Sequence, residues 1–405
     1  MNICVLTHTF PRNKEDSAAA FMKKFADGLV LAGSKVVVVT PYDKKFKRPN
    51  DPFKIVMYKY IYPRSLHLLG YSRTMEKDVT LKIRAFLLFP LMFVFGTITL
   101  LKVVRKEKID LINVHWLLPN GLMAFIVSKL TGIPYVVTLP GTDVYLACSN
   151  KLFGWVARII AKNSSGIVAL NQLFLNRIAK LKVNNIPTRI IHYPVDSKEF
   201  YPSESGVSDL RKKFGFVNSN IVIMAIGRLV YKKGFEYLIK AMPRITKRFP
   251  NVRLVIGGAG DLMGRLTTLA TKLKVDKKIV FTGNVKHNEI LSFYNLADIM
   301  VTPSVIDPKG NADGDTVVSF ESMVCGKPLV VTDFLGVSGV IKDGVHGFIV
   351  HPKNSKELAY AIEKLIKSGK LRRKMGRLGR ELVEKQLSPR QVGKEYVKFF
   401  KQIVS

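Results

Sequence analysis

The sequence of 405 residues is poor in acidic side chains and in cysteine. It contains 30 Asp and Glu residues against 64 Lys and Arg residues, which gives a formal net charge of +34 at pH 7. Its three cysteines, Cys4, Cys148 and Cys325, do not form the disulfide framework of a small secreted domain. Cys4 and Cys325 stand in apolar surroundings, so we expect both to be reduced core residues. The charge predicts attraction to an anionic partner: nucleic acid, an anionic bilayer surface or phosphorylated substrates.

The sequence also lacks the signals of several protein classes. The N-terminal residues MNICVLTHTFP have no basic region and no apolar region before a cleavage site. We therefore expect a first strand in place of a signal peptide, and a cytoplasmic protein. No zinc, helix-turn-helix or RNA-recognition signature occurs, so nucleic-acid binding would depend on charge alone, and we expect no nucleic-acid partner.

Short apolar runs alternate with helical patterns along the chain, which is typical of parallel sheets covered by helices. The expected strands are 3–7, 35–40, 111–114, 135–139, 166–170, 189–192, 220–226, 253–256, 279–282, 299–302 and 329–332. Two such halves predict two Rossmann-like, doubly wound α/β domains facing a cleft. We place them at 1–197 and 198–388, because Pro, Asp and Ser cluster near the first boundary.

The stretch ADGDTVVSFESMVCGKP holds two carboxylates, Asp313 and Glu321, eight residues apart. The spacing puts Asp313 in a loop and Glu321 in the first turns of a helix. Free N–H groups and the positive dipole end at a helix N-terminus suit a diphosphate, and carboxylates accept hydrogen bonds from sugar hydroxyls. The pattern predicts a nucleotide-sugar site.

A second motif, GRLVYKKG, follows an expected strand at 220–226 and opens a helix. Gly227 allows close backbone approach, and Arg228 and Lys233 supply positive charge for a diphosphate. A glycine turn with Gly258 and Gly260 follows the next strand, although a lone glycine turn is a weak signal.

Both motifs resemble those of the retaining glycosyltransferases of family 4, which carry E-x7-E before CGKP, and GRLVxxKG; here the first acid is Asp. The resemblance implies the GT-B fold, with a last helix at 389–405 returning to the first domain. It also implies a retaining transferase whose Arg228 and Lys233 hold the donor diphosphate, assisted by the amides of Thr316 and Val317. In the same way it implies that Glu321 holds the ribose, Asp313 the donor sugar, and Gly258, Gly260 and Val285 the nucleotide.

The first half departs from this family at one place. Pro140-Gly141-Thr142-Asp143 stands where the family has HGxD, so the donor-contacting histidine is replaced by Pro140, while Gly141 and Asp143 are kept. We expect Asp143 on the donor side and Gly141 at the cleft. His115, after a strand, is either a cleft residue or a structural one. Ser17 and Ala18 lie in a loop at the carboxyl end of the first strand, where such folds bind ligands.

The partners follow from the same residues. Asp313-Gly314-Asp315 spells D-x-D, a metal signature of another glycosyltransferase class, but the basic diphosphate clamp argues against a metal. We expect no cofactor, a UDP- or GDP-linked sugar donor, and a sugar or lipid-linked acceptor. An epimerase or phosphorylase of the same fold, and a basic nucleic-acid-binding protein, are the alternatives.

The stretch 85–101, AFLLFPLMFVFGTITLL, is almost entirely apolar. It is at the lower limit for a membrane span and directly precedes an expected strand, which leaves a buried helix or a helix with one face in a bilayer. Basic and aromatic residues interleave at 44–73, and 364–401 holds thirteen basic and three acidic residues. These stretches are either a solvated basic surface or a surface for anionic lipid, on the inner face of the cytoplasmic membrane.

Overall fold

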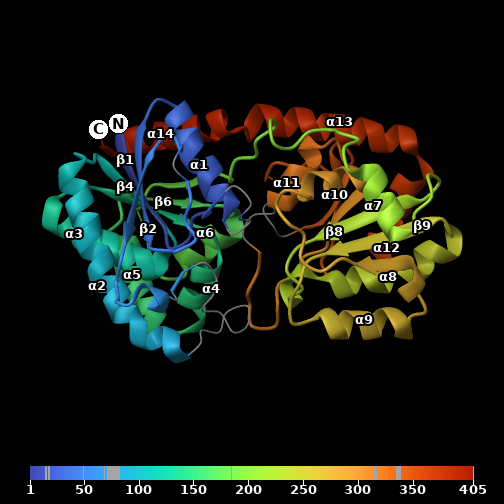
Figure 1. Cartoon of the computed structure of the whole chain (residues 1–405), viewed down its shortest axis with the longest axis horizontal. Helices are drawn as coiled ribbons and strands as arrows, with labels where there is room; N and C mark the ends of the chain where they lie inside the picture. Colours follow the sequence, from blue (N-terminus) through green and yellow to red (C-terminus); the bar gives the residue numbers. More distant parts are fainter. Residues whose placement is uncertain are drawn as a thin grey trace. The chain divides into compact units, whose positions relative to one another are not determined.

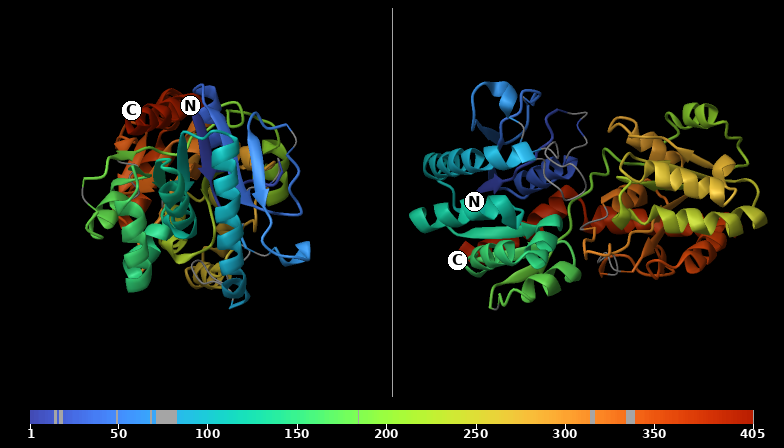
Figure 2. Two further views of the ribbon diagram at one scale, coloured as in Figure 1. Left: turned by 90° about the vertical axis from the view of Figure 1, so that its left-hand side faces the viewer. Right: turned by 90° about the horizontal axis from the view of Figure 1, so that it is seen from below.

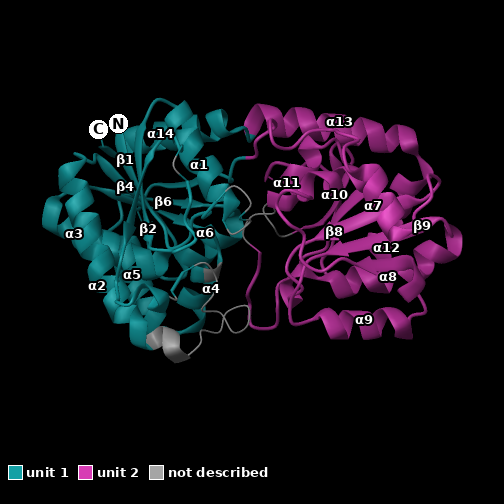
Figure 3. Cartoon of the chain, viewed as in Figure 1, with its two compact units in different colours: residues 1–194, 387–405 teal, residues 195–386 magenta. Residues whose placement is uncertain are grey.

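The computed structural model describes residues 1–13, 16, 19–48, 50–67, 69–70, 83–183, 185–313, 317–333 and 339–404. The chain forms two compact units (Figure 3). Unit 1 comprises Met1–Pro194 and Leu387–Ser405, and unit 2 comprises Val195–Gln386.

Unit 1 is built on a seven-stranded sheet of order β3-β2-β1-β4-β5-β6-β7, in which the paired strands run parallel. Its strands are β1 (Asn2–Leu6), β2 (Lys35–Pro41), β3 (Lys54–Tyr58), β4 (Leu111–His115), β5 (Tyr135–Leu139), β6 (Gly166–Ala169) and β7 (Thr188–Ile190). The chain moves outward from β1 to β3 and then returns to β4 on the other side of β1. This reversal between β1 and β4 is the switch point at which parallel sheets bind ligands.

Helices cover both faces of this sheet (Figure 1). They are α1 (Ala20–Leu31), α2 (Ile83–Lys106), α3 (Leu122–Thr131), α4 (Thr142–Ser149), α5 (Lys151–Lys162), α6 (Gln172–Ala179) and α14 (Pro389–Val404), with short turns η1 (Arg64–Leu66) and η2 (Leu117–Gly121). Because parallel crossovers are right-handed, α2, α3 and α5 lie on one face and α1 on the other. In agreement, α2 and α5 both contact α3, and α1 packs on α14.

The C-terminal helix α14 belongs to unit 1, which confirms the expected return to the first domain. Its contact with α1 depends on two glycines, since a Cβ at Gly28 would strike the carbonyl oxygen of Pro389, and one at Gly393 would strike that of Gly28. The rings of Phe25 and Tyr396 then meet edge to face, 4.8 Å apart. Buried aromatic packing of this kind fixes the helix to the unit.

Unit 2 has a six-stranded parallel sheet of order β10-β9-β8-β11-β12-β13, with its switch point between β8 and β11. The strands are β8 (Ile221–Ile226), β9 (Val252–Gly257), β10 (Ile279–Phe281), β11 (Ile299–Thr302), β12 (Leu329–Thr332) and β13 (Gly347–Val350). The helices are α7 (Val207–Phe214), α8 (Phe235–Arg248), α9 (Met263–Lys272), α10 (Ile290–Leu296), α11 (Val317–Val324), α12 (Ser355–Lys367) and α13 (Gly369–Gln386), with short turns η3 (Tyr231–Lys233) and η4 (Asp276–Lys278). Two strands at sheet edges, β3 and β13, were not predicted, because short, half-exposed strands lack the continuous apolar run of a central strand.

In the described part of the stretch 44–73, most basic side chains are exposed, whereas most aromatic ones are not. Phe53, Tyr58 and Tyr60 are buried, because β3 and the residues after it pack on the core of unit 1. The guanidinium of Arg48 is also buried, in an ion pair with Asp51. Among the aromatic residues described there, Tyr62 is the strongly exposed one, at 88%.

The apolar stretch 85–101 lies within α2, whose part Leu87–Lys106 is long and apolar enough to cross a membrane by length and composition. Only 28% of that part is buried, so α2 is not an ordinary core helix. It nevertheless packs one face on α3, β1, β2 and β3, which ties it into unit 1.

Candidate active site

The residues of the two unit 2 motifs gather at the carboxyl ends of β8 and β11, on either side of the switch point. Gly227 and Arg228 directly follow β8, and the loop that ends at Asp313 follows β11. The order of the strands therefore brings together two segments that are about eighty residues apart in the sequence.

The centre of this site is an ion pair between Lys233 and Asp313. The Nζ atom of Lys233 lies 2.8 Å from Oδ2 of Asp313, and both side chains are mostly buried. The hydroxyl of Ser304, which follows β11, donates a 2.9 Å hydrogen bond to the same carboxylate oxygen. The side chain of Lys233 crosses over Gly227, where a Cβ would come within 3.2 Å of the lysine Cε. The glycine thus provides the space in which the ammonium group reaches the carboxylate.

Glu321 is held by a tyrosine that the sequence analysis missed. Its Oε2 atom accepts a 2.7 Å hydrogen bond from the hydroxyl of Tyr294, which comes from α10. Burial, with a contribution from Glu321, raises the pKa of Tyr294 well above its ordinary value, so the phenol remains a donor. The bond fixes the carboxylate on α11. No sequence signal links α10 to α11, whereas Ser304 could have been found from its place after a strand.

The glycine turns pack against one another beside Gly227. The N–H of Gly227 donates to the carbonyl oxygen of Gly257, and that of Gly258 to the carbonyl oxygen of Gly283, at 2.7 Å. Gly258 has φ of 139°, and a Cβ there would strike the carbonyl oxygen of Gly227, so this close approach requires glycine. The half-buried side chain of Val285 lies against Gly257. A Cβ at Gly260 would likewise strike the backbone of Leu229. At the carboxyl edge of the unit 2 sheet, these turns therefore present mainly backbone atoms and few side-chain atoms.

Of the three remaining residues predicted to bind the donor, two lie in the part of the chain that the structure describes. Arg228 is exposed, and Val317 begins α11 with a half-buried side chain. Thr316 and Asp315 lie outside the described residues. The structure therefore brings Gly227, Arg228, Lys233, Asp313 and Val317 to one edge of the sheet, with Glu321 inside α11.

In unit 1, Asp143 is buried and holds two loop amides. Its Oδ2 accepts a 2.7 Å hydrogen bond from the N–H of Leu117, and its Oδ1 a 3.1 Å bond from that of Gly141. Burial raises the pKa of Asp143, and these backbone donors oppose the change. Gly141, with φ of 131°, precedes α4. The carboxylate thus joins the loops after β4 and β5.

His115 is a core residue and does not lie at a surface where an acceptor could bind, so of its two predicted alternatives the structural one holds and the cleft one is wrong. It is fully buried in β4, its Nδ1 lies 2.9 Å from the hydroxyl of Tyr193, and its ring packs edge to face on Phe25. Burial, with a contribution from His8, lowers the pKa of His115 to about 3. His115 is the last residue of β4, and its side chain lies on the face of the sheet where Phe25 of α1 packs.

The switch point of unit 1 carries His8 after β1 and Trp116 after β4. Their ring centroids are 4.2 Å apart, and the amide of Asn120 lies 3.2 Å from Nδ1 of His8. Trp116 has φ of 70°, a strained conformation for a bulky residue and one that often occurs at binding sites. Burial lowers the pKa of His8 to about 4. This partly buried pair of rings lies at the switch point of unit 1, as the lysine–aspartate pair lies at that of unit 2.

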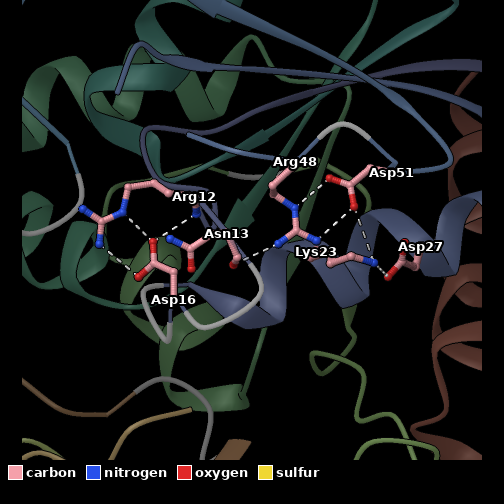
Figure 4. A network of polar contacts seen from close by, with 7 residues as sticks. All are labelled: Arg12, Asn13, Asp16, Lys23, Asp27, Arg48 and Asp51. Carbon is pink, nitrogen blue, oxygen red and sulfur yellow. Dashed lines mark hydrogen bonds and ion pairs between the residues drawn. The ribbon is translucent and has the colours of Figure 1, made fainter. Parts of the chain in front are cut away.

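Ser17 and Ala18 lie outside the described residues, but their neighbours Asn13 and Asp16 are anchored (Figure 4). Arg12 pairs with Asp16. Arg48 holds Asp51 with two hydrogen bonds of 2.7 and 2.9 Å and donates to the carbonyl oxygen of Asn13 at 3.0 Å. This network fixes the loop after β1 to the loop after β2.

The described part of the chain contains no group of three or more His, Cys, Asp or Glu side chains that could hold a metal ion. Asp315, the second acid of the D-x-D sequence, is not among the residues searched. The charge opposite Asp313 is that of Lys233.

Comparison with known proteins assigns the family. The model described as "Glycosyl transferases group 1" matches residues 207–382, and that described as "Glycosyltransferase Family 4" matches residues 18–199. An uncharacterised glycosyltransferase of Methanocaldococcus jannaschii is 26% identical, over 99% of this chain and 98% of its own. Alpha-monoglucosyldiacylglycerol synthase of Acholeplasma laidlawii is 25% identical, over 83% of this chain and 81% of its own.

Among solved structures, the Anabaena protein HepE, in a complex with UDP and glucose, is 19% identical. It aligns with a TM-score of 0.76 over 99% of this chain and all of its own, which confirms the expected GT-B fold. The two family matches together cover most of the chain, and it belongs to the group 1 and family 4 glycosyltransferases.

Proposed function

We propose that this glycosyltransferase moves a sugar from a nucleoside diphosphate sugar to a hydroxyl acceptor and retains the anomeric configuration. The observation that carries the proposal is the Lys233–Asp313 pair beside Gly227, at the switch point of the unit 2 sheet. An ammonium group suits a phosphate, and a carboxylate suits sugar hydroxyls. A site that places both within hydrogen-bonding distance fits a ligand that carries both groups.

Each side chain then has a role. Lys233 and Arg228 compensate the charge of the leaving diphosphate, with the amide of Val317 at the start of α11 assisting. Asp313 binds the donor sugar and Glu321, fixed by Tyr294, binds the ribose hydroxyls. The backbone around Gly258, Gly260 and Val285 receives the nucleotide, because the closely packed turns leave it accessible.

The reaction breaks the bond between C1 of the sugar and the diphosphate oxygen, and forms a bond from C1 to the acceptor oxygen on the same face. The acceptor proton passes to the departing diphosphate, so the protein needs no base. Electrostatic stabilisation of that diphosphate is the main catalytic contribution. For this reason we propose neither a metal ion nor a cofactor.

The donor base is uracil or guanine in this proposal. HepE, which has the same fold, binds UDP, and this supports uracil as the donor base.

On the acceptor side, we propose that unit 1 binds a sugar or lipid-linked acceptor near His8 and Trp116, because an aromatic face can pack on an apolar sugar face. The Acholeplasma relative is named for a glucosyldiacylglycerol product, which supports a lipid acceptor and a peripheral place on the inner face of the cytoplasmic membrane.

Binding of nucleoside diphosphates tests the proposal. The thermal unfolding midpoint should rise with UDP or GDP and not with the nucleosides, because a ligand specific to the folded state stabilises it. The wild-type chain should then transfer sugar from the matching donor, and NMR of the product should show the anomer of the donor. Absence of any nucleoside diphosphate binding would overturn the proposal, and an epimerised donor or a free sugar phosphate would favour an epimerase or a phosphorylase.

A further inference from the structure

Helix α2 is apolar on two opposite faces, and only one of them is covered. Met92, Gly96, Leu100 and Val104 form the covered face against the core of unit 1. The other face carries five exposed large apolar side chains: Leu87, Leu91, Val94, Phe95 and Ile98. A sixth, Phe89, is also exposed but lies on the side of the covered face, one turn before Met92. Leu87 is 77% exposed. Soluble monomers seldom expose a contiguous apolar stripe of this kind, and one that does usually has a partner.

A second helix on the same face of the sheet repeats the feature. The first turns of α5 expose Leu152, Phe153 and Trp155, the last at 61%, while Gly154 and Ala157 are buried. Tryptophan is enriched where an apolar phase meets water, because its ring is apolar and its N–H is polar. We call the five side chains on the exposed face of α2 and the three exposed side chains of α5 the docking face.

In α2 the exposed face changes from apolar to basic along the chain, and in α5 the exposed apolar residues have Lys151 before them and basic residues after them. Lys102, Arg105 and Lys106 end α2, and Arg158 and Lys162 end α5, and all five are exposed. Lys102 lies about 6 Å beyond Ile98 along the axis of α2, and Arg158 lies about 4.5 Å beyond Trp155 along that of α5.

The apolar halves of both helices lie at the same edge of the sheet. In a parallel crossover the helix runs antiparallel to the strands, so the N-terminal half of α2, before β4, and that of α5, before β6, lie toward the carboxyl edge. Figure 2 shows α2 running alongside the sheet of unit 1 and beyond it. His8 and Trp116 lie at that same edge.

We propose that the docking face inserts into an anionic phospholipid bilayer, which places the carboxyl edge of unit 1 against the membrane. Charge identifies the bilayer as the partner of the docking face, because basic side chains follow the apolar ones and anionic phosphate headgroups would neutralise them. A second copy of the chain would bring the same cations against one another. Complete insertion of α2 would require its covered face to leave the core.

The inference rests on the proposed function only in its consequence for the substrate. An acceptor drawn from the bilayer at this edge has a lipid anchor and a hydroxylated headgroup. The docking itself depends on the exposed residues of α2 and α5 alone.

The chain provides its own reporter, since Trp116 and Trp155 are its two tryptophans. In a Trp116→Phe variant, the emission of Trp155 should shift to the blue when vesicles of phosphatidylcholine with phosphatidylglycerol are added. Lipids brominated in the acyl chains should quench it. Binding should weaken as salt rises and leave an apolar, salt-resistant part. If the protein sediments with the vesicles but the emission of Trp155 is unchanged, the assignment of the docking face is overturned.

Matched variants localise the contact. The triple change Leu91→Gln, Val94→Gln and Phe95→Gln should lower vesicle partitioning by about a hundredfold, because it removes inserted apolar surface. The control Val217→Gln with Tyr360→Gln, which changes exposed apolar residues of unit 2, should bind like the wild type. Vesicle binding by the triple variant equal to that of the wild type would contradict the proposal. So would sedimentation equilibrium in which the wild type is a dimer and the triple variant is a monomer.

Nucleoside diphosphate binding, measured on the same variants, separates the two proposals. The triple variant should keep it and should keep its thermal unfolding midpoint. If the wild type binds nucleotide but not vesicles, only the docking proposal is overturned. If it binds vesicles but not nucleotide, only the proposed function is overturned.

Discussion

The ammonium group of Lys233 lies 2.8 Å from Oδ2 of Asp313, across the switch point of the unit 2 sheet. Separating a mostly buried ion pair is unfavourable unless another charge replaces the lost partner. A donor diphosphate would supply that replacement for Lys233, while the sugar hydroxyls would supply donors for Asp313. The pairing thus keeps the two side chains in place before the substrate binds.

Replacing Lys233 by alanine should lower transfer by about 10²- to 10³-fold, as loss of one group that stabilises developing charge does in other enzymes. The measurement is kcat at saturating donor, with thermal unfolding as a check on folding. Lys240→Ala, at an exposed site on α8, removes the same charge and should be nearly neutral. Near-normal turnover by Lys233→Ala would contradict the proposed role.

Changing Tyr294 to phenylalanine should raise the KM for the donor and leave kcat close to normal. The change removes the hydrogen bond to Glu321, so the carboxylate is less well fixed for the ribose. A hydrogen bond to a charged group contributes about 1.5 to 3 kcal/mol, which corresponds to roughly a 10- to 100-fold increase. The control is Tyr396→Phe, which removes the hydroxyl of a buried tyrosine in unit 1, away from Glu321, and should leave the KM unchanged. An unchanged KM would remove the ribose role of Glu321.

Chelation should leave activity intact, because the cationic side chains Arg228 and Lys233 compensate the leaving group in the proposed mechanism. The experiment compares initial rates with and without EDTA after dialysis. Complete loss of activity that Mg²⁺ or Mn²⁺ restores would revive the D-x-D interpretation of Asp313 and Asp315.

Unit 1 should lose stability below about pH 6.5. Burial lowers the pKa of His8 to about 4 and that of His115 to about 3, from an ordinary value of 6.5. The unfolded chain therefore binds protons that the folded chain does not, and the free energy of unfolding falls as the pH drops. From about pH 7.5 to about pH 5.5 the fully buried His115 should account for about 1.4 kcal/mol, and the partly exposed His8 for less.

Tryptophan fluorescence during urea unfolding measures this in unit 1 alone, because both tryptophans lie there. His115→Gln should be less stable at every pH but should show a smaller pH slope. A slope equal to that of the wild type would show that other groups cause the dependence.

The patterns in the sequence predicted the two doubly wound halves and the donor motifs, and the resemblance to the family 4 glycosyltransferases implied the return of the last helix. The halves could be predicted because parallel strands buried on both faces read as continuous apolar runs. The donor motifs could be found because Gly227 follows a predicted strand and Asp313 and Glu321 are eight residues apart. The boundaries proposed at 197 and 388 remain predictions, and the two units divide at Pro194 and Gln386. The roles of the site residues likewise remain predictions.

Only the tertiary structure decided which side chains face one another. It placed His115 in the core and Asp143 against two loop amides, and it paired Tyr294 with Glu321 across two helices. It also showed that the aromatic residues at 53–60 are largely buried whereas one face of α2 is exposed. A pattern along the chain gives the period of an apolar face but not what covers it, because burial depends on contacts between segments far apart in the sequence.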